Sequence, residues 1–144
     1  MAHAENDITI NRPAGEVYAF LADGLNNPKW RPGVQTIALK NGAAGEPGAV
    51  YSQTLTGPKG RPLQGDYKIT DAEPGRLLGF QVVAGPARPS GRYQLTEHDG
   101  STTVRFSLDL RLPLVMRVLD SLVTKTMESE VAQLKNLKGV IEAG

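Results

Sequence analysis

The C-terminal segment, residues 113–144, places the strongest constraint on the fold. Its apolar residues recur at steps of three, four and five, the spacing of one face of an α-helix, and charged residues fill most other positions. The apolar face consists of Val115, Leu119, Leu122, Met127, Val131, Leu134, Leu137 and Ile141. A helix of about 28 residues is roughly 42 Å long, and it is stable only when a broad surface packs against its apolar face.

The rest of the chain predicts that partner surface. Short segments alternate between apolar and polar residues, as strands with one buried face do. The expected strands cover residues 5–11, 34–40, 49–56, 62–72, 77–84, 91–98 and 102–112. Asp99-Gly100 is a strong hairpin signal, Pro13 starts a helix that ends near Gly24, and one further helical turn is expected before Pro32.

This order of elements predicts one α+β domain covering residues 1–144. One strand, one or two short helices and about six further strands precede the long helix. Strands joined by short turns form an antiparallel meander. We therefore expect a curved sheet of about seven strands, wrapped around the C-terminal helix on its apolar face.

Composition excludes several classes of function. A net charge of +1 gives no electrostatic basis for binding nucleic acid or an anionic membrane. The chain has no cysteine, so it has no disulfide, thiolate metal site or cysteine nucleophile. His3 and His98 are far apart, and no phosphate loop, dinucleotide fingerprint or metal signature is present, so we expect no cofactor and no metal. No segment approaches transmembrane length and the N-terminus lacks a signal-peptide core, which predicts a cytoplasmic protein without integral membrane association.

The order of elements resembles the helix-grip fold of the START-related, or SRPBCC, superfamily. Residues 10–23, INRPAGEVYAFLAD, are similar to the opening strand, proline and helix of its bacterial polyketide cyclase/dehydrase branch. Residues 28–34, PKWRPGV, look like the tryptophan-containing connector of that branch, and residues 73–78 and 100–104 match its later strand boundaries. The resemblance covers about residues 5 to 142. It implies a deep, mostly apolar cavity between sheet and helix that holds a hydrophobic small molecule, and it implies no single reaction.

Aromatic residues are the first candidates for ligand contacts. Five of them fall on the apolar parity of the strands: Tyr51, Tyr67, Phe80, Tyr93 and Phe106. Tyrosine hydroxyls in an apolar pocket would orient a carbonyl or hydroxyl group of a ligand. The alternative for each is a place in the core, with the hydroxyl bonded to backbone or water. Trp30, the only tryptophan, either closes the mouth of the cavity or anchors the connector against the sheet.

One side of the C-terminal helix would supply further ligand contacts. Its residues are Met116, Leu119, Leu122, Val123, Thr126, Met127 and Glu130. Methionine adapts to irregular ligands, but at helical spacing it also serves simply as packing. A buried Glu130 carboxylate would act as a general acid or base, whereas a Glu130 at the solvent edge would only join the neighbouring charges.

The opposite strand parity predicts a solvated outer face of the sheet. Its charged residues include Arg92, Arg105, Asp109 and Arg111. Cross-strand charge pairs on such a face contribute little stability. A bulge would turn Arg92 or Arg105 inward, toward the cavity.

Three classes of function remain. The leading prediction is a carrier or sensor, monomeric or homodimeric, that binds a lipid, polyketide or aromatic metabolite between sheet and helix. The alternative is a cyclase, dehydratase or aromatase that moves protons with cavity tyrosines, an inward arginine or Glu130. In the third class, a packed core leaves no cavity, and the long helix or an edge strand binds another protein. A titratable group that points into the cavity beside a second polar group would favour the enzyme.

Overall fold

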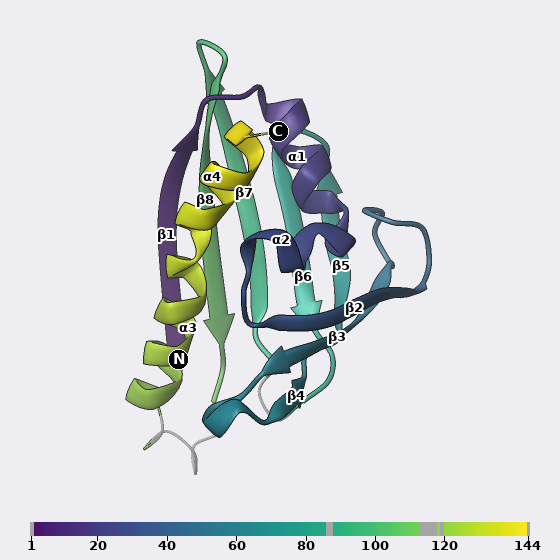
Figure 1. Cartoon of the computed structure of the whole chain (residues 1–144), viewed down its shortest axis with the longest axis vertical. Helices are drawn as coiled ribbons and strands as arrows, with labels where there is room; N and C mark the ends of the chain where they lie inside the picture. The colour runs from purple at the N-terminus through teal and green to yellow at the C-terminus, as the bar shows by residue number, and fades with distance from the viewer. Residues whose placement is uncertain (1, 86–87, 113–117, 119, 144) are drawn as a thin grey trace.

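A computed structural model describes residues 2–85, 88–112, 118 and 120–143, and its strands form one antiparallel sheet (Figure 1). The sheet has eight strands in the order β1-β8-β7-β6-β5-β3-β2, with β4 paired to β3. The strands are β1 (Ala2–Ile10), β2 (Val34–Asn41), β3 (Val50–Thr56), β4 (Pro62–Gln64), β5 (Tyr67–Glu73), β6 (Leu77–Val82), β7 (Ser90–His98) and β8 (Ser101–Leu110). The helical elements are α1 (Ala14–Ala22), η1 (Gly24–Asn26), α2 (Asn27–Trp30), η2 (Pro58–Gly60), α3 (Asp120–Ala132) and α4 (Leu134–Ala143). The predicted α+β helix-grip architecture is confirmed.

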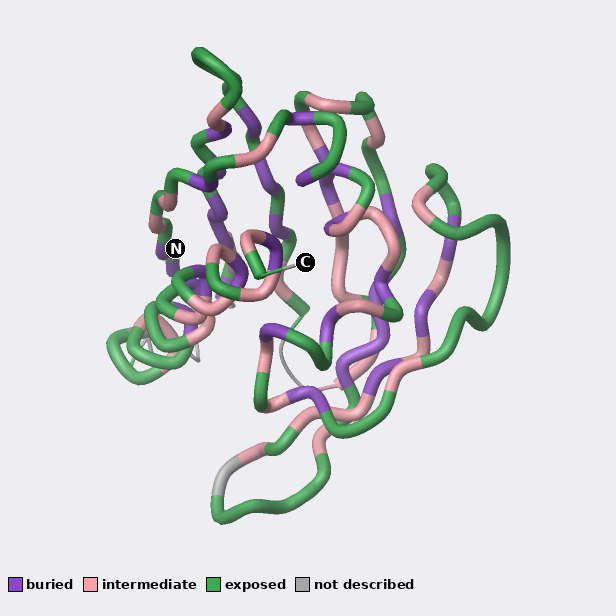
Figure 2. The backbone as a smooth tube through the Cα atoms, turned by 45° about the horizontal axis from the view of Figure 1, so that its top comes forward, coloured by how far each residue is buried: buried purple, intermediate pink, exposed green. Residues whose placement is uncertain are grey.

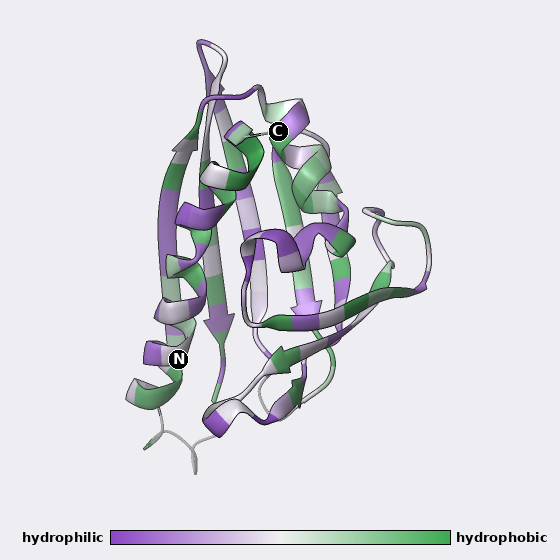
Figure 3. Ribbon diagram, viewed as in Figure 1, coloured by the Kyte–Doolittle hydropathy of each residue, from purple (hydrophilic) through white to green (hydrophobic). Residues whose placement is uncertain are grey.

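The sheet buries one face because its strands alternate between apolar and polar residues. In β8, Val104 and Phe106 are buried, whereas Arg105 between them is exposed. The helices α1, α2, α3 and α4 all lie on the same side of the sheet (Figure 1). Figure 2 shows buried and exposed residues alternating along the strands, and Figure 3 shows hydropathy alternating along α3 and α4. The core therefore lies between the sheet and these helices.

The turn between β7 and β8 has the geometry that its sequence predicts. Asp99 and Gly100 have φ angles of 51° and 79°, so both occupy the left-handed region. Two consecutive residues of this kind form the type I′ turn, which matches the twist of an antiparallel hairpin. The turn fixes the register of β7 and β8, in which His98 lies opposite Ser101 and Tyr93 opposite Phe106.

The single strand expected for residues 62–72 is wrong, because Gly65 and Asp66 divide it into β4 and β5. Asp66 Oδ1 accepts a hydrogen bond from the Gln53 backbone N–H at 3.0 Å. The Gly65 N–H donates to the Gln53 carbonyl at 2.8 Å. Both interrupting residues are thus held on the middle of β3. As a result β4 pairs with the last residues of β3, and β5 pairs with its first residues.

The long C-terminal helix is present, but it is divided at Gln133 into α3 and α4. Here the backbone hydrogen bonds join residues three apart rather than four. The Gln133 N–H donates to the Glu130 carbonyl at 3.2 Å, and the Asn136 N–H donates to the Gln133 carbonyl at 2.8 Å. The Asn136 side chain also donates to the Trp30 carbonyl at 3.1 Å. The division therefore lies where the helix is joined to α2.

The C-terminal half of the predicted apolar helix face is confirmed, and the N-terminal half is not. The buried members are Met127, Val131, Leu134, Leu137 and Ile141. Leu122 was expected on the same face, but its side chain is 63% exposed. Leu122 lies five positions before the buried Met127, about 140° away around the helix, whereas Val123, four positions before Met127, is partly buried against the core. Val115 and Leu119 lie outside the described residues.

The outer face of the sheet is solvated, as expected. The charged residues Arg92, Arg105 and Arg111 are all exposed, and none of them turns inward. Arg105 Nε donates to Asp7 Oδ1 at 2.9 Å across the β1–β8 pair. Ion pairs this exposed contribute little to stability.

Two leucines of the C-terminal helix test this arrangement. Leu134 is 0% exposed and Leu122 is 63% exposed. We expect Leu134→Ala to lower the free energy of unfolding by about 2–5 kcal/mol, because it leaves a cavity in the core. Leu122→Ala should change it by about 0.5 kcal/mol or less. Urea unfolding followed by circular dichroism measures both values. Equal losses at the two positions would contradict the burial described here.

Candidate ligand cavity

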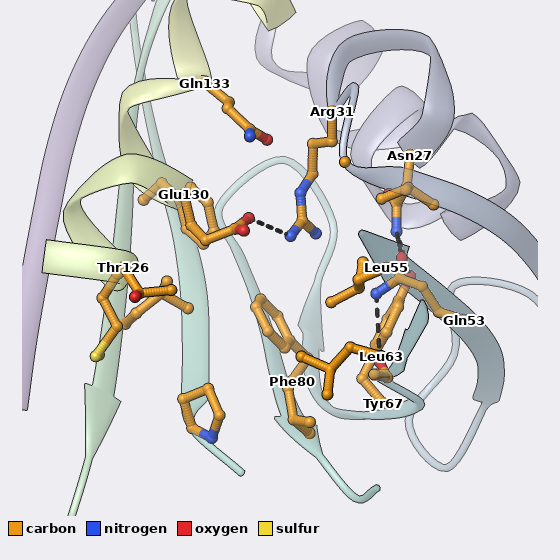
Figure 4. A pocket seen from close by; sticks show the side chains of 18 of the residues that line it. Asn27, Arg31, Gln53, Leu55, Leu63, Tyr67, Phe80, Thr126, Glu130 and Gln133 are labelled. Carbon is orange, nitrogen blue, oxygen red and sulfur yellow. Dashed lines mark hydrogen bonds and ion pairs between the residues drawn. The ribbon is translucent and has the colours of Figure 1, made fainter. Parts of the chain in front are cut away.

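A cavity of about 490 Å³ lies between the sheet and α3. Residues of β3 to β8 line one side, and residues at α2 and α3 line the other (Figure 4). Most of the lining is aliphatic or aromatic, with a small number of polar side chains. Small-molecule sites are typically concave, apolar and a few hundred cubic ångströms in volume. The interior is therefore not fully packed, which argues against the third class of function, a protein-binding module without a cavity.

The five aromatic residues expected on one sheet face do lie together there. Their rings form a continuous row across the strands, with neighbouring centroids 5.2 Å apart for Tyr51 and Tyr67, 5.5 Å for Tyr67 and Phe80, 5.9 Å for Phe80 and Tyr93, and 4.5 Å for Tyr93 and Phe106. These separations are typical of favourable aromatic pairs. Four members of the row line the cavity: Tyr67, Phe80, Tyr93 and Phe106.

Tyr51 and Trp30 are in the core rather than at the cavity. The Tyr51 hydroxyl accepts from the Gly45 N–H at 3.1 Å and donates to the Ala22 carbonyl at 3.4 Å, so the backbone occupies it. Trp30 is 2% exposed, and its ring meets the rings of Tyr93 and Phe106 edge-on at 6.3 Å each. Of the two roles considered for Trp30, this geometry is that of an anchor for the connector.

The C-terminal helix contributes the second half of its expected contact surface. Val123, Thr126, Met127 and Glu130 line the cavity. Leu122 does not, because its side chain is exposed on another side of α3. Met116 and Leu119 are outside the described residues.

Arg31 and Glu130 form an ion pair inside the cavity lining. Arg31 Nη2 lies 2.7 Å from Glu130 Oε2, and the two side chains are 11% and 32% exposed. In Figure 4 they point toward one another from α2 and α3. The Arg31 guanidinium carbon also lies 5.8 Å from the centre of the Trp30 ring. The pair therefore joins two elements that border the cavity.

The charge on Arg31 is held by its partner. Burial alone lowers the pKa of an arginine, but the charge of Glu130 and its hydrogen bond outweigh that effect and raise the pKa of Arg31. Arg31 was not predicted as a site residue, because an arginine in a proline-flanked connector has no periodic pattern that shows its direction. The one sequence feature that could have pointed to Arg31 is its position directly after Trp30.

A second polar group lies beside Tyr67. Asn27 Nδ2 donates to Gln53 Oε1 at 3.1 Å and to the Tyr67 hydroxyl oxygen at 2.9 Å. Gln53 Nε2 donates in turn to the Gly65 carbonyl at 3.3 Å. Because the Tyr67 oxygen accepts a bond, its own O–H remains free to donate to another acceptor. Gly24 permits this arrangement, since a Cβ atom there would collide with the Tyr67 hydroxyl.

Sequence reasoning missed Asn27 and Gln53 for different reasons. Gln53 shares the strand parity of Tyr51 and Leu55, so a polar residue on an apolar face was visible in the alternation. Asn27 lies in the short connector, where no periodicity applies. Its role depends on η1 and α2 bringing it against β3 and β5, which only the tertiary structure shows.

Burial keeps both cavity tyrosines protonated. Burial raises the pKa of Tyr93 to about 12, although the positive charge of Arg31 opposes the shift. Burial likewise raises the pKa of Tyr67, against the hydrogen bond from Asn27. Both hydroxyls are therefore neutral hydrogen-bond donors at physiological pH.

The raised pKa of Tyr93 makes stability depend on alkaline pH. In the unfolded chain the phenol ionises near pH 10, whereas in the folded chain it ionises near 12. Its contribution to stability is thus complete below pH 10 and is lost as pH rises toward 12. Over this interval the free energy of unfolding should fall by up to about 1.4 kcal/mol per pH unit from this group. Urea unfolding at a series of alkaline pH values should give a shallower fall for Tyr93→Phe. An unchanged slope would contradict the assignment.

The described residues show neither of two other kinds of site. None of their helices is long and apolar enough to cross a membrane. They also contain no group of three or more histidine, aspartate or glutamate residues that could hold a metal ion. The polar side chains of the cavity lining described above include those of an arginine, a glutamate, two amides and two tyrosines.

Solved structures show the same fold at low sequence identity. The Zhui aromatase/cyclase from Streptomyces sp. R1128 has a TM-score of 0.77 and 16% identity, covering 97% of this chain and 93% of that one. A START superfamily protein from Mycobacterium smegmatis has a TM-score of 0.76 and 15% identity, covering 99% of each chain. Ara h 8.0201 has a TM-score of 0.72 and 21% identity, covering 99% of this chain and 98% of that one. Identities this low show a shared fold and no more.

Sequence comparison identifies the family. A comparison with curated proteins finds no match. The sequence model of the family described as "Polyketide cyclase / dehydrase and lipid transport" matches residues 1–142, nearly the whole chain. This match agrees with the strand, proline, helix and connector segments of the sequence and with the helix-grip structure. The chain belongs to the polyketide cyclase/dehydrase and lipid transport family.

Proposed function

We propose that this protein binds a hydrophobic small molecule, a lipid, polyketide or aromatic metabolite, in the cavity between sheet and helix, as a carrier or sensor. The observation that carries the proposal is the cavity of about 490 Å³, which is lined mostly by apolar side chains. Removing an apolar ligand from water into such a space is favourable in proportion to the area buried. The description of the family includes lipid transport.

The polar groups of the cavity support binding better than proton transfer. Efficient general acid or base catalysis needs a group whose pKa lies near the working pH. The pKa of Tyr93 is about 12, and burial shifts that of Tyr67 in the same direction, so neither hydroxyl releases its proton readily. The Glu130 carboxylate is paired with the Arg31 guanidinium at 2.7 Å. These groups are arranged to donate hydrogen bonds and to balance charge.

A cyclase, dehydratase or aromatase activity is the second candidate, and one observation favours it. Glu130 is a titratable group at the cavity, within hydrogen-bond distance of Arg31, which meets the geometric condition for catalysis. In this mechanism Tyr67 or Tyr93 would polarise a ligand carbonyl and Glu130 would take up a proton. Incubation with a poly-β-carbonyl substrate and mass analysis for cyclised or dehydrated product tests it. Turnover abolished by Glu130→Gln would favour the enzyme, and absence of turnover with binding intact would favour the carrier.

Two neighbouring valines, Val82 at the end of β6 and Val83 directly after it, test the carrier proposal. Val82 lines the cavity, whereas Val83 lies next to it in the chain, does not line the cavity and is 37% exposed. We expect Val82→Trp to fill cavity space and to weaken binding of the uncharged fluorescent probe N-phenyl-α-naphthylamine by about tenfold or more. Val83→Trp, the matched control, should bind as the native protein does. Fluorescence titration measures both affinities, and thermal unfolding confirms that the variants are folded.

The same titration can contradict the proposal. A native protein that produces no saturable increase in probe fluorescence has no accessible apolar site of this size. Equal affinity in the native protein and the Val82→Trp variant would place the probe elsewhere on the molecule.

A further inference from the structure

We propose that the ligand of this cavity is a carboxylic acid with an apolar body, and that Arg31 receives its carboxylate in place of Glu130. The inference rests on the proposed function, since it names the chemical class of ligand for the same cavity. It follows from the hydrogen-bonding state of Arg31, from the donors around it, and from the partial exposure of Glu130.

Arg31 has unused hydrogen-bonding capacity in a buried place. Its guanidinium makes one hydrogen bond to the described residues, from Nη2 to Glu130 at 2.7 Å. The Nε atom of Arg31 is buried and has no hydrogen-bond partner among the described residues. A buried donor without an acceptor is costly, and a guanidinium presents five N–H groups in a fork that matches a carboxylate. Arg31 lines the cavity, so a ligand can reach this fork.

The neighbouring side chains add donors directed at the same space. Tyr93 lines the cavity, and its hydroxyl makes no hydrogen bond to the described residues. The charges of Arg31 and Glu130 both act on this hydroxyl, which places all three groups in one electrostatic neighbourhood. The Tyr67 O–H is also free to donate, since its oxygen accepts from Asn27. A ligand that brings acceptors and negative charge is complementary to this set.

Gln133 extends toward Arg31 in Figure 4 and lines the same side of the cavity. Its Oε1 is buried and has no partner among the described residues. An amide group presents two donors as well as an acceptor, and its two ends exchange by a half-turn. Gln133 is therefore able to donate to a carboxylate held by Arg31.

Glu130 is placed to give way to an incoming carboxylate. Its side chain is 32% exposed, whereas that of Arg31 is 11% exposed. Turning toward water returns Glu130 to solvent, while Arg31 stays buried against the Trp30 ring. A buried cation must keep a partner, and exchanging one carboxylate for another preserves that condition. A neutral ligand cannot make this exchange, so the cavity discriminates in favour of acids.

The apolar body of the ligand fits the remainder of the cavity. The lining includes Leu63, Val82 and Leu110, which present hydrocarbon only. The cavity therefore combines a partly buried ion pair, between Arg31 and Glu130, with a mostly apolar wall. This combination suits an amphipathic acid.

The test compares two probes of nearly equal size and shape, β-naphthoic acid and β-naphthyl methyl ketone, at neutral pH. Isothermal titration calorimetry measures each dissociation constant for the native protein and for Arg31→Met, Glu130→Gln and Arg105→Met. Arg105→Met is the matched control, because it removes an exposed arginine of the outer face whose partner is Asp7. Circular dichroism confirms the fold of each variant.

We expect the native protein to bind the acid at least about tenfold more tightly than the ketone. Arg31→Met should remove this preference. Glu130→Gln should strengthen acid binding by roughly tenfold, because it removes the competing charge and leaves the buried guanidinium in need of an anion. Arg105→Met should leave both affinities unchanged.

The outcomes separate this inference from the function on which it rests. Equal affinities for acid and ketone in the native protein, or acid binding that Glu130→Gln weakens, would overturn the preference for acids and leave the apolar-ligand proposal in place. Binding of neither probe would overturn both. If Arg31→Met is poorly folded, two measurements still decide the matter: the preference of the native protein for the acid, and the change in acid affinity caused by Glu130→Gln.

Discussion

The apolar concave face of the sheet must be covered, and no single helix among the described residues covers all of it. The helices α3 and α4 pack against β1, with α3 also reaching β8, whereas α1 packs against β6, β7 and β8. The two groups of helices meet through α2, where Asn136 bonds the Trp30 carbonyl and Glu130 pairs with Arg31. The space that remains between these covers is the cavity. Its position thus follows from how the sheet is closed.

The cavity has an energetic cost that the rest of the fold must offset. An unfilled apolar space forgoes packing contacts, and each polar group at its wall gives up hydration. The aromatic row from Tyr51 to Phe106 and the fully buried leucines of α4 supply compact packing on either side. An unpaired polar group at the wall of a cavity is a candidate for function. Arg31, whose buried Nε has no partner among the described residues, is such a candidate.

Much of the fold follows from local sequence patterns, namely strand alternation and turn residues. Period-two alternation in β8 and the Asp99-Gly100 turn specify a hairpin without reference to the rest of the chain. The division at Gly65 and Asp66 does not follow in this way, because it depends on hydrogen bonds to Gln53 in another strand. The exposure of Leu122 was also not predicted, since its spacing from the other apolar residues of the helix suggested the buried face.

The sequence by itself determined the strand faces, the order of the elements, the aromatic row and the family. Each of these depends on residue periodicity or on short segments, and both are readable along the chain. Only the tertiary structure decided which polar side chains share the cavity. Arg31, Asn27 and Glu130 come from a short connector and a distant helix, and their directions are set by where α2 and α3 pack rather than by any repeat around them. The long amphipathic helix was predicted as one continuous element. The structure divides it at Gln133, because that is where it is bonded to α2 beside the cavity.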